Sequence, residues 1–288
     1  MDDMPWRTLT DAATLQDHLD DDLVVVDCRF DLADTGRGER DYRVSHVPGA
    51  LYAHLDRDLS SPITPDSGRH PLPDVDRLVN WLGRLGIGEE TQVVAYDDSG
   101  GTMAVRLWWL LRWLGHDRVS VLDGGWQQWL AGGHPLQAQA IEPASSTLFR
   151  GTPDWSQVVA TEDIAGQLEI GPDDIRIMDA RTGERYRGEQ EPIDPVAGHI
   201  PGAFNLPLTG NLAEDGRFLP ADILRKRYTQ AIGGLQPDRI AAMCGSGVTA
   251  CHNLLAMEIA GLPGGRLYAG SWSEWIRDPR RPVATGGD

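Results

Sequence analysis

A cysteine begins a loop of small residues in the last fifth of the chain. The loop follows the apolar run 240–243 and precedes a helix-like run at 250–260, and its residues are Cys244, Gly245, Ser246, Gly247, Val248 and Thr249. Glycines allow successive main-chain N–H groups to point at one spot, and the positive end of the following helix adds to them. Because a thiolate is stabilised at such a spot, we predict that Cys244 is a reactive nucleophile and not an inert core cysteine.

The chain also repeats itself over the length of a domain. Residues 46–50 (HVPGA) return as 199–203 (HIPGA), and on this repeat residues 93–100 match 240–247. Asp97 therefore takes the position of Cys244. A period of this length indicates two similar domains and not a solenoid. We predict one reactive copy and one copy whose nucleophile position holds a carboxylate.

Together these segments resemble the tandem-domain rhodanese sulfurtransferases over nearly the whole chain. A GSWSEW run at 270–275 is also typical of that family. The uncharged residues directly after Cys244 resemble the 3-mercaptopyruvate branch, because the thiosulfate branch typically has basic residues there. The resemblance implies that Gly245, Gly247, Val248 and Thr249 form the donor-binding loop.

A thiolate surrounded by main-chain donors can attack a divalent sulfur and keep it as a persulfide, whose charge the donors stabilise. The expected sulfur donor is 3-mercaptopyruvate, with thiosulfate as the second choice. The expected acceptor is a thiol, such as thioredoxin or a small thiol, or cyanide. This chemistry requires no metal and no organic cofactor.

Two other functions are compatible with a reactive cysteine. A cysteine phosphatase or arsenate reductase needs an arginine six residues after the cysteine for bidentate contact with an oxyanion, and that position holds Ala250. A rhodanese module that delivers sulfur to a partner protein without turnover stays open. A steady-state assay with free small acceptors distinguishes such a carrier from an enzyme.

The anionic end of the donor requires cationic side chains. Arginines cluster after an expected strand of the second copy, and the resemblance implies that Arg185 binds the donor carboxylate. Arg187 is expected to be solvated, and Arg181 to be structural, because it belongs to an Asp-x-Arg pattern present in both copies. Ile193 stands where 3-mercaptopyruvate enzymes commonly have a second substrate arginine, which predicts weaker binding of that donor.

The resemblance further implies three residues that handle protons. Ser246 matches the serine of this group, His70 its histidine and Asp56 its aspartate. The histidine can accept the thiol proton of the donor while the carboxylate orients the ring. The histidines at 46 and 199 recur in both copies, so we expect them to shape turns.

Short β-branched runs alternate with helical patterns in both copies. The expected strands are 23–27, 92–96, 119–122, 175–178, 239–243 and 266–268, with helical spacing at 75–85 and 102–114. This alternation predicts an α/β fold of two tandem rhodanese-like domains, each a parallel sheet flanked by helices. We place the non-catalytic N-terminal domain at 1–136, the linker at 137–155 and the catalytic C-terminal domain at 156–288.

The composition of the 288-residue chain fits a soluble cytoplasmic enzyme. Its net charge of −17 disfavours binding to nucleic acid or anionic membranes. Three cysteines without framework spacing argue against a disulfide scaffold, and no paired Cys-x-x-Cys spacing indicates a metal site. We expect no signal peptide, since the N-terminus is acidic, and no membrane helix, since no apolar run approaches about 20 residues.

Overall fold

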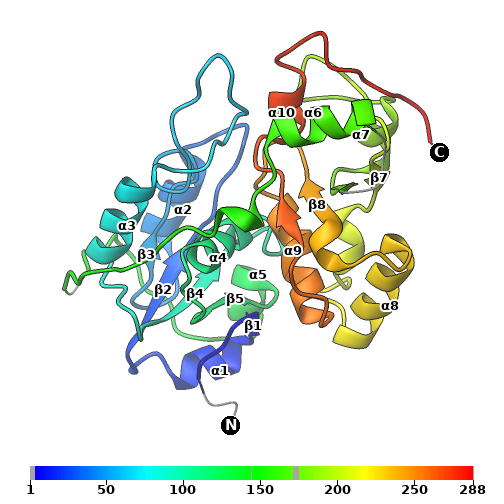
Figure 1. Cartoon of the computed structure of the whole chain (residues 1–288). Coiled ribbons are helices and arrows are strands. Elements are labelled where there is room, and N and C mark those ends of the chain that lie inside the picture. Colours follow the sequence, from blue (N-terminus) through cyan, green and yellow to red (C-terminus); the bar gives the residue numbers. More distant parts are fainter. Residues whose placement is uncertain (1–3, 144, 171–174, 288) are drawn as a thin grey trace. The chain divides into compact units, whose positions relative to one another are not determined.

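The computed structural model describes residues 4–143, 145–170 and 175–287, and the chain divides into two compact units (Figure 1). Unit 1 comprises Met1–Ser61, Leu72–Asp154 and Glu214–Phe218, and unit 2 comprises Pro62–Pro71, Trp155–Ala213 and Leu219–Asp288. Each unit contains one copy of the repeat, but residues 62–71 group with the second copy. His70 therefore belongs to the same unit as Cys244. The domain boundaries given above follow the repeat and stay a prediction.

In the described part of the chain, unit 1 is built on a five-stranded parallel sheet in the order β1-β5-β4-β2-β3. Its strands are β1 Leu9–Thr10, β2 Leu23–Asp27, β3 Leu51–Tyr52, β4 Gln92–Tyr96 and β5 Val119–Leu122. The central strand β4 is buried at every position. A parallel sheet covered on both faces favours such continuous apolar runs over strict alternation.

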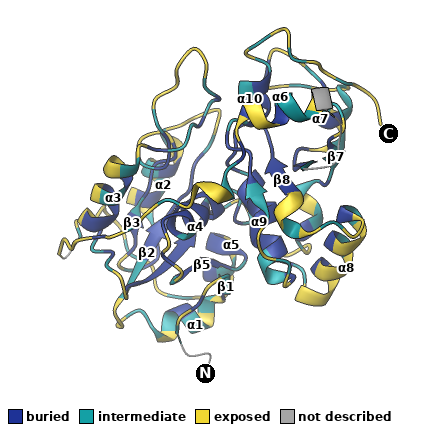
Figure 2. Ribbon diagram, viewed as in Figure 1, coloured by how far each residue is buried: buried dark blue, intermediate teal, exposed yellow. Residues whose placement is uncertain are grey.

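Helices alternate with the strands of unit 1. They are α1 Ala12–Asp17, α2 Arg37–Val44, α3 Val75–Arg84, α4 Ala104–Trp113 and α5 Gly125–Ala131. Helix α3 begins after Asp74, whose carboxylate accepts the Arg77 N–H at 2.9 Å as an N-cap. Helix α4 is buried along nearly its whole length (Figure 2). Because α4 follows the Asp97 loop directly, it holds that loop against the end of β4.

Among the residues that the structure describes, unit 2 has a four-stranded parallel sheet in the order β7-β6-β8-β9. The strands are β6 Arg176–Asp179, β7 Phe204–Asn205, β8 Ile240–Met243 and β9 Arg266–Leu267. The helices are α6 Thr161–Ile170, α7 Gly183–Arg187, α8 Ala221–Ile232, α9 Ala250–Ile259 and α10 Ser271–Trp275, with 3-10 turns at Trp155–Gln157, Leu208–Asn211 and Pro237–Arg239. Figure 2 shows α9 largely buried and α8 exposing one face.

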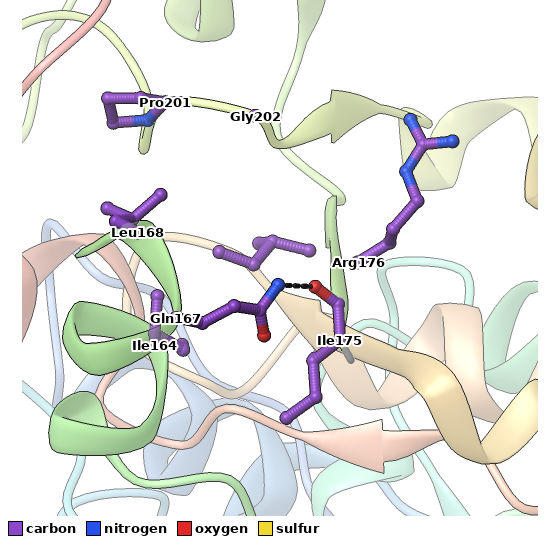
Figure 3. Close-up of a pocket in the computed structure, with 8 residues that line it drawn as sticks. Ile164, Gln167, Leu168, Ile175, Arg176, Pro201 and Gly202 are labelled. Atoms are coloured by element: carbon purple, nitrogen blue, oxygen red, sulfur yellow. Dashed lines mark hydrogen bonds between the residues drawn. The ribbon is translucent and has the colours of Figure 1, made fainter. Parts of the chain in front are cut away.

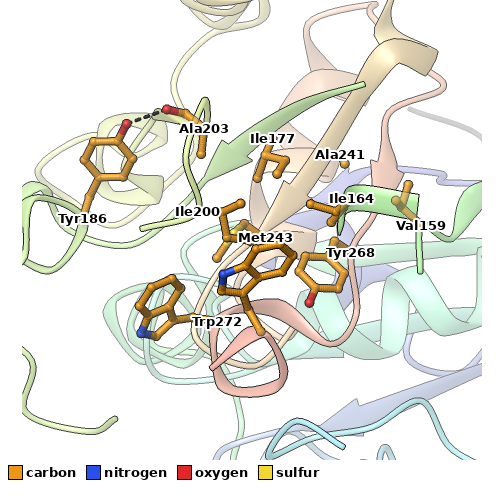
Figure 4. Close-up of a cluster of buried hydrophobic side chains, with 11 residues drawn as sticks. Val159, Ile164, Ile177, Tyr186, Ile200, Ala203, Ala241, Met243, Tyr268 and Trp272 are labelled. Carbon is orange, nitrogen blue, oxygen red and sulfur yellow. Dashed lines mark hydrogen bonds between the residues drawn. The ribbon is translucent and has the colours of Figure 1, made fainter. Parts of the chain in front are cut away.

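An apolar cluster packs against the sheet of unit 2 (Figure 4). Its members are Val159, Ile164, Ile177, Tyr186, Ile200, Ala203, Ala241, Met243, Tyr268, Trp272 and Trp275. Met243 ends β8 directly before Cys244, and Trp272 lies in α10. Truncation of a buried tryptophan to alanine typically costs about 3–5 kcal/mol. The same packing that stabilises unit 2 therefore fixes the base of the Cys244 loop.

Candidate active site

Cys244 directly follows β8, at the carboxyl end of the unit 2 sheet. Its main-chain N–H donates to Ser271 Oγ at 3.1 Å, and its carbonyl oxygen accepts the Trp272 N–H at 3.1 Å. The residue is only 1% exposed. Because both main-chain groups are bound at the start of α10, the sulfur has a fixed place at the base of the loop.

Gly247 turns the loop so that its main chain faces the sulfur. Its φ is +77°, and a Cβ at this position would overlap the Ala269 carbonyl oxygen. The Gly247 N–H donates to Cys244 Sγ at 3.2 Å. Within the described chain, no protein acceptor receives the main-chain N–H groups of Ser246, Val248 or Thr249. The loop thus has donors available for a further anionic atom beside the sulfur.

His70 meets the loop at Ser246. Its Nδ1 lies 2.7 Å from Ser246 Oγ, and both side chains are buried. The main chain before His70 is anchored by α10, where Arg69 N–H donates to Ser273 Oγ at 3.0 Å. A Cβ at Gly68 would lie 2.6 Å from Gly270 O, so only glycine fits this approach. The structure brings together the predicted pair of His70 and Ser246.

Arg185 lies in α7 and is engaged by two carboxylates. Its Nε and Nη2 donate to Glu191 at 3.1 and 2.7 Å, and Nη2 also donates to Asp194 at 3.2 Å. Burial raises the pKa of the Glu191 carboxyl, but hydrogen bonds from Arg185 and from the Asp194 N–H outweigh burial and hold that pKa below its usual range. Arg185 is therefore held in a defined orientation by acceptors of this chain.

Arg69 is a functional candidate that the sequence reasoning missed. Its Nη1 donates to Asp194, and its Nη2 lies 2.7 Å from the position that a Cβ would take at Gly245. Both Nη atoms of Arg185 lie 3.6 to 3.7 Å from the same position. Two guanidinium groups therefore lie beside the residue that follows Cys244, although the loop itself has no basic residue.

The other arginines of this region have structural or solvated positions. Arg181 donates from Nε and Nη2 to the Asp179 carboxylate. It also packs over the Trp272 ring, with 4.7 Å from its guanidinium carbon to the ring centroid. Arg187 is more exposed and binds Glu189 at 2.8 Å. These contacts agree with the roles expected for both arginines.

Asp56 and Asp97 lie in unit 1. Asp56 is exposed, and its main-chain N–H donates to His54 Nδ1 at 3.2 Å. A role for Asp56 as a partner of His70 stays a prediction. Asp97 is fully buried at the end of β4, and its carboxylate accepts main-chain N–H groups of its own loop. The four donors are Ser99, Gly101, Met103 and Ala104, at 2.7 to 2.9 Å.

A separate pocket of unit 2 has no part in this site. Figure 3 shows Gln167 of α6, whose side-chain amide donates to the Ile175 carbonyl oxygen, and Arg176 and Gly202 also line the pocket. None of the residues that line this pocket belongs to the Cys244 loop. Its lining is mostly apolar and offers no nucleophile.

Comparison with known proteins identifies the family. The family model described as Rhodanese-like domain matches residues 11–132 and 162–278, one match for each copy of the repeat. The chain belongs to the rhodanese family. The predicted tandem-domain rhodanese architecture and α/β fold class are therefore confirmed.

Some relatives of this chain are named for 3-mercaptopyruvate and others for thiosulfate as the sulfur donor. A probable 3-mercaptopyruvate sulfurtransferase of Pseudomonas aeruginosa is 51% identical over 269 residues, covering 92% of this chain and 93% of that protein. A putative thiosulfate sulfurtransferase of Mycobacterium tuberculosis, SseB, is 36% identical over 273 residues, covering 92% of each. The solved structure of 3-mercaptopyruvate sulfurtransferase from Leishmania major has a TM-score of 0.83 at 32% identity, covering 95% of this chain and 76% of that chain. The predicted class of enzyme, a sulfurtransferase, agrees with all three.

No helix in the described ranges combines the length and the apolar character that a membrane span requires. Among the same residues, no group of three His, Cys, Asp or Glu side chains is arranged to hold a metal ion. The cytoplasmic location and the identity of the acceptor stay predictions.

Proposed function

We propose that this rhodanese transfers a sulfane sulfur from 3-mercaptopyruvate to a thiol or cyanide through a persulfide on Cys244. The observation that carries the proposal is the Cys244 sulfur, 3.2 Å from the Gly247 nitrogen in a loop whose neighbouring N–H groups have no protein acceptor among the described residues. The guanidinium groups beside Gly245 support an anionic donor. The names of the relatives support the same class of reaction.

In the first half-reaction, the Cys244 thiolate attacks the sulfur of the donor. A sulfur–sulfur bond forms, the bond between C3 of the donor and its sulfur breaks, and the electron pair of that bond leaves with the carbon as the enolate of pyruvate. The proton of the donor thiol moves to the enolate carbon, which gives pyruvate. The outer sulfur keeps the negative charge, and the main-chain donors of the loop stabilise it as an oxyanion hole stabilises an oxyanion.

The pair of His70 and Ser246 is suited to that proton transfer. The two side chains are 2.7 Å apart and are buried beside the nucleophile. Histidine accepts and returns a proton near neutral pH, and the serine hydroxyl can pass it on. Arg185 holds the carboxylate of the donor, with both Nη atoms on the Gly245 side of the loop.

In the second half-reaction, an acceptor anion attacks the outer sulfur and restores the Cys244 thiolate. A thiolate acceptor leaves as a persulfide, and cyanide leaves as thiocyanate. No separate redox partner is needed, because the oxidation of Cys244 to the persulfide is balanced by reduction of the donor carbon, and the acceptor reduces Cys244 again when it takes the outer sulfur. The experiment that tests the proposal is incubation with 3-mercaptopyruvate without acceptor, followed by mass spectrometry of the Cys244 peptide.

The expected result is one added sulfur atom on Cys244 and an equal amount of released pyruvate. Cys244→Ser should abolish both, whereas Cys28→Ser, which alters a buried thiol of unit 1, should retain both. With excess cyanide, the enzyme should form thiocyanate over many turnovers. Release of a single equivalent would instead favour the sulfur-carrier alternative, and turnover by Cys244→Ser would reject the mechanism.

A further inference from the structure

Four buried side chains form a hydrogen-bond network at the helix that follows the Cys244 loop, here called the polar network. Its members are Asn211, Tyr228, His252 and Asn253. All four are 0% exposed. They join the first turn of α9 to the 3-10 turn Leu208–Asn211 and to α8, which lies beside α9 (Figure 1). None of them takes part in the chemistry proposed above.

One main-chain oxygen fixes the direction of the bonds in the polar network. The Leu206 oxygen can only accept, so Asn253 Nδ2 donates to it at 2.9 Å and Asn253 Oδ1 is left to accept. Asn211 Nδ2 therefore donates to Asn253 Oδ1 at 2.8 Å and to His252 Nδ1 at 3.1 Å. Asn211 Oδ1 in turn accepts from the Tyr228 hydroxyl at 3.0 Å. His252 is thus held as a neutral ring whose proton lies on Nε2.

The polar network occupies a place that apolar side chains could fill. Burial of polar groups is unfavourable unless they are bonded, and apolar groups of the same shape can be as stabilising as a bonded pair. What a bonded network adds is one fixed arrangement of the segments that it joins. In unit 1 the helix after the Asp97 loop, α4, contains neither histidine nor asparagine. The polar network is therefore not a requirement of the fold and belongs to the unit that has the nucleophile.

The first turn of α9 orients the peptide groups of the Cys244 loop. The Cys251 thiol donates to the Gly247 oxygen at 3.5 Å, and the Cys251 N–H donates to the Val248 oxygen at 3.1 Å. The His252 N–H donates to the Thr249 oxygen at 3.2 Å. In a trans peptide the oxygen and the following N–H point in opposite directions. The N–H groups of Val248 and Thr249 are therefore directed away from the body of α9.

The loop is thus held at both ends. Its start is fixed by α10, where Ser271 Oγ accepts the Cys244 N–H and the Trp272 N–H donates to the Cys244 oxygen. Its end is fixed by the polar network, because His252 and Asn253 are bonded to residues outside α9. Donors that are fixed before the reaction need no rearrangement when charge develops beside them.

We propose that the polar network positions the first turn of α9, and through it the main-chain donors of Val248 and Thr249 that bind the outer sulfur of the Cys244 persulfide. Its members act through α9 and are positioning residues. The inference rests on the proposed function, because these donors matter only when a persulfide forms. A displaced donor stabilises the developing charge less, so sulfur transfer slows, whereas binding of the sulfur donor through Arg185 is retained.

The test compares His252→Leu with His252→Asn in the full chain. Both substitutions remove Nε2, but the asparagine oxygen can still accept from Asn211 where Nδ1 did. In single turnovers with 3-mercaptopyruvate, His252→Leu should lower the saturating rate of pyruvate release about tenfold. The half-saturating concentration should change less than about twofold, since binding of the sulfur donor is retained. His252→Asn should recover most of the lost rate.

Two further variants separate alignment from stability. Tyr228→Phe removes only the hydroxyl that binds Asn211 and should lower the saturating rate about threefold. The matched control is Ile232→Ala on the same helix, because Ile232 is 3% exposed and makes no bond to the polar network. This truncation should lower Tm while leaving the single-turnover rate at the wild-type value.

Wild-type rates in His252→Leu and Tyr228→Phe would overturn the inference, and so would equal losses in His252→Leu and His252→Asn. A loss in Ile232→Ala as large as in Tyr228→Phe would also overturn it, because the rate would then follow stability. If His252→Leu does not fold, Tyr228→Phe against Ile232→Ala decides the matter. Sulfur loading of wild-type Cys244 judges the proposed function separately: its absence rejects that function, whereas normal loading with unaffected variants rejects only the inference.

Discussion

Asp97 and Cys244 hold the same place in the two repeats, each directly after an inner strand of its sheet, but their side chains use the following loop differently. The Asp97 carboxylate accepts four main-chain N–H groups, whereas the Cys244 sulfur accepts the N–H of Gly247. In unit 1 the anion-binding loop is filled by its own side chain. In unit 2 two of the corresponding donors, the N–H groups of Ser246 and Val248, have no protein acceptor among the described residues, which is what a persulfide requires.

Asp97→Ala should destabilise unit 1 without abolishing sulfur transfer. The substitution removes a charged acceptor from buried donors, and each buried donor left without a partner costs about 1–3 kcal/mol. Cys244 lies in the other repeat, so persulfide formation should persist in the folded variant. Calorimetric unfolding and mass spectrometry of the same sample measure the two effects.

Asp98→Ala is the control for this prediction. Asp98 is the neighbouring carboxylate, and it pairs with the exposed guanidinium of Arg37 at 3.3 Å. A pair of this kind contributes about 0–1 kcal/mol, so the unfolding of this variant should change little. A folded Asp97→Ala protein without persulfide on Cys244 would show that unit 1 takes part in the chemistry.

The longer strands could be predicted because their residues give a clear pattern. Strands β2, β4 and β5 have the bounds expected from their β-branched runs. Strands β1, β3 and β7 have two residues each, which is too short for any period to appear. Strand β9 is equally short, but it lies within the predicted run 266–268. The two-residue strands exist because their main chains pair with a longer neighbour, and that pairing is a tertiary property.

Comparison of the two repeats distinguishes residues with a structural role from residues that belong to the candidate active site. Arg29 and Arg181 each bind the aspartate two residues earlier, and each lies 4.7 Å from the centroid of a tryptophan ring. His46 and His199 each place Nδ1 within 2.6 to 2.7 Å of a main-chain oxygen. A role that recurs in both units cannot depend on a nucleophile that only one of them has.

The charged surroundings of Cys244 were only partly predictable. Arg185 and His70 were expected from the family resemblance, but Arg69 and the carboxylates at 191 and 194 were not. Arg69 reaches Asp194 across 125 residues of sequence, which a linear pattern does not contain. Arg185 meets Glu191 and Asp194 six and nine residues along the chain, but the sequence does not show that the loop between them folds back. The one available signal was the position of Arg69 directly before a candidate histidine.

Arg185→Ala should impair the use of 3-mercaptopyruvate much more than Arg187→Ala. Loss of a charged hydrogen bond to the donor lowers kcat/KM about tenfold to a hundredfold. Arg187 is paired with Glu189 near the surface, so its removal should change kcat/KM little. Steady-state kinetics of both variants, with circular dichroism to verify folding, tests this difference. Equal losses would contradict the assignment of Arg185.

Ser246→Ala and His70→Asn should slow transfer from 3-mercaptopyruvate and alter its pH dependence. Proton transfer by a positioned group contributes about a hundredfold or more to a rate. Discharge of a preformed persulfide to cyanide should be much less affected, because no enolate is protonated in that step. A pH profile of kcat for each half-reaction measures this.

The control for the proton-transfer prediction is His18→Asn. His18 is a histidine of unit 1 that pairs with Asp21 at 2.6 Å, and its loss should leave both half-reactions unchanged. Wild-type kcat and pH profile in both site variants would remove His70 and Ser246 from the mechanism.

The enzyme should prefer 3-mercaptopyruvate over thiosulfate. Thiosulfate leaves as sulfite, a dianion near neutral pH, whose departure would be stabilised by basic loop residues. The loop offers Gly245 and Ser246 instead, and neither of them is basic. The negative charge of an enolate is stabilised better by the Ser246 hydroxyl and the main-chain donors of the loop. The measurement is kcat/KM for both donors with the same acceptor.

Ile193→Arg should lower KM for 3-mercaptopyruvate. Ile193 is 45% exposed, and its N–H donates to Glu191 Oε1 at 3.1 Å, so an arginine here would add a cation next to the carboxylates that hold Arg185. Ile223→Arg is the control for added charge alone, because Ile223 is 46% exposed on α8, and its KM should not change. The expected wild-type pattern is a substantial kcat with a high KM, which Ile193→Arg improves. A higher kcat/KM with thiosulfate, together with no effect of Ile193→Arg, would reject the 3-mercaptopyruvate assignment while leaving the sulfurtransferase chemistry of Cys244 intact.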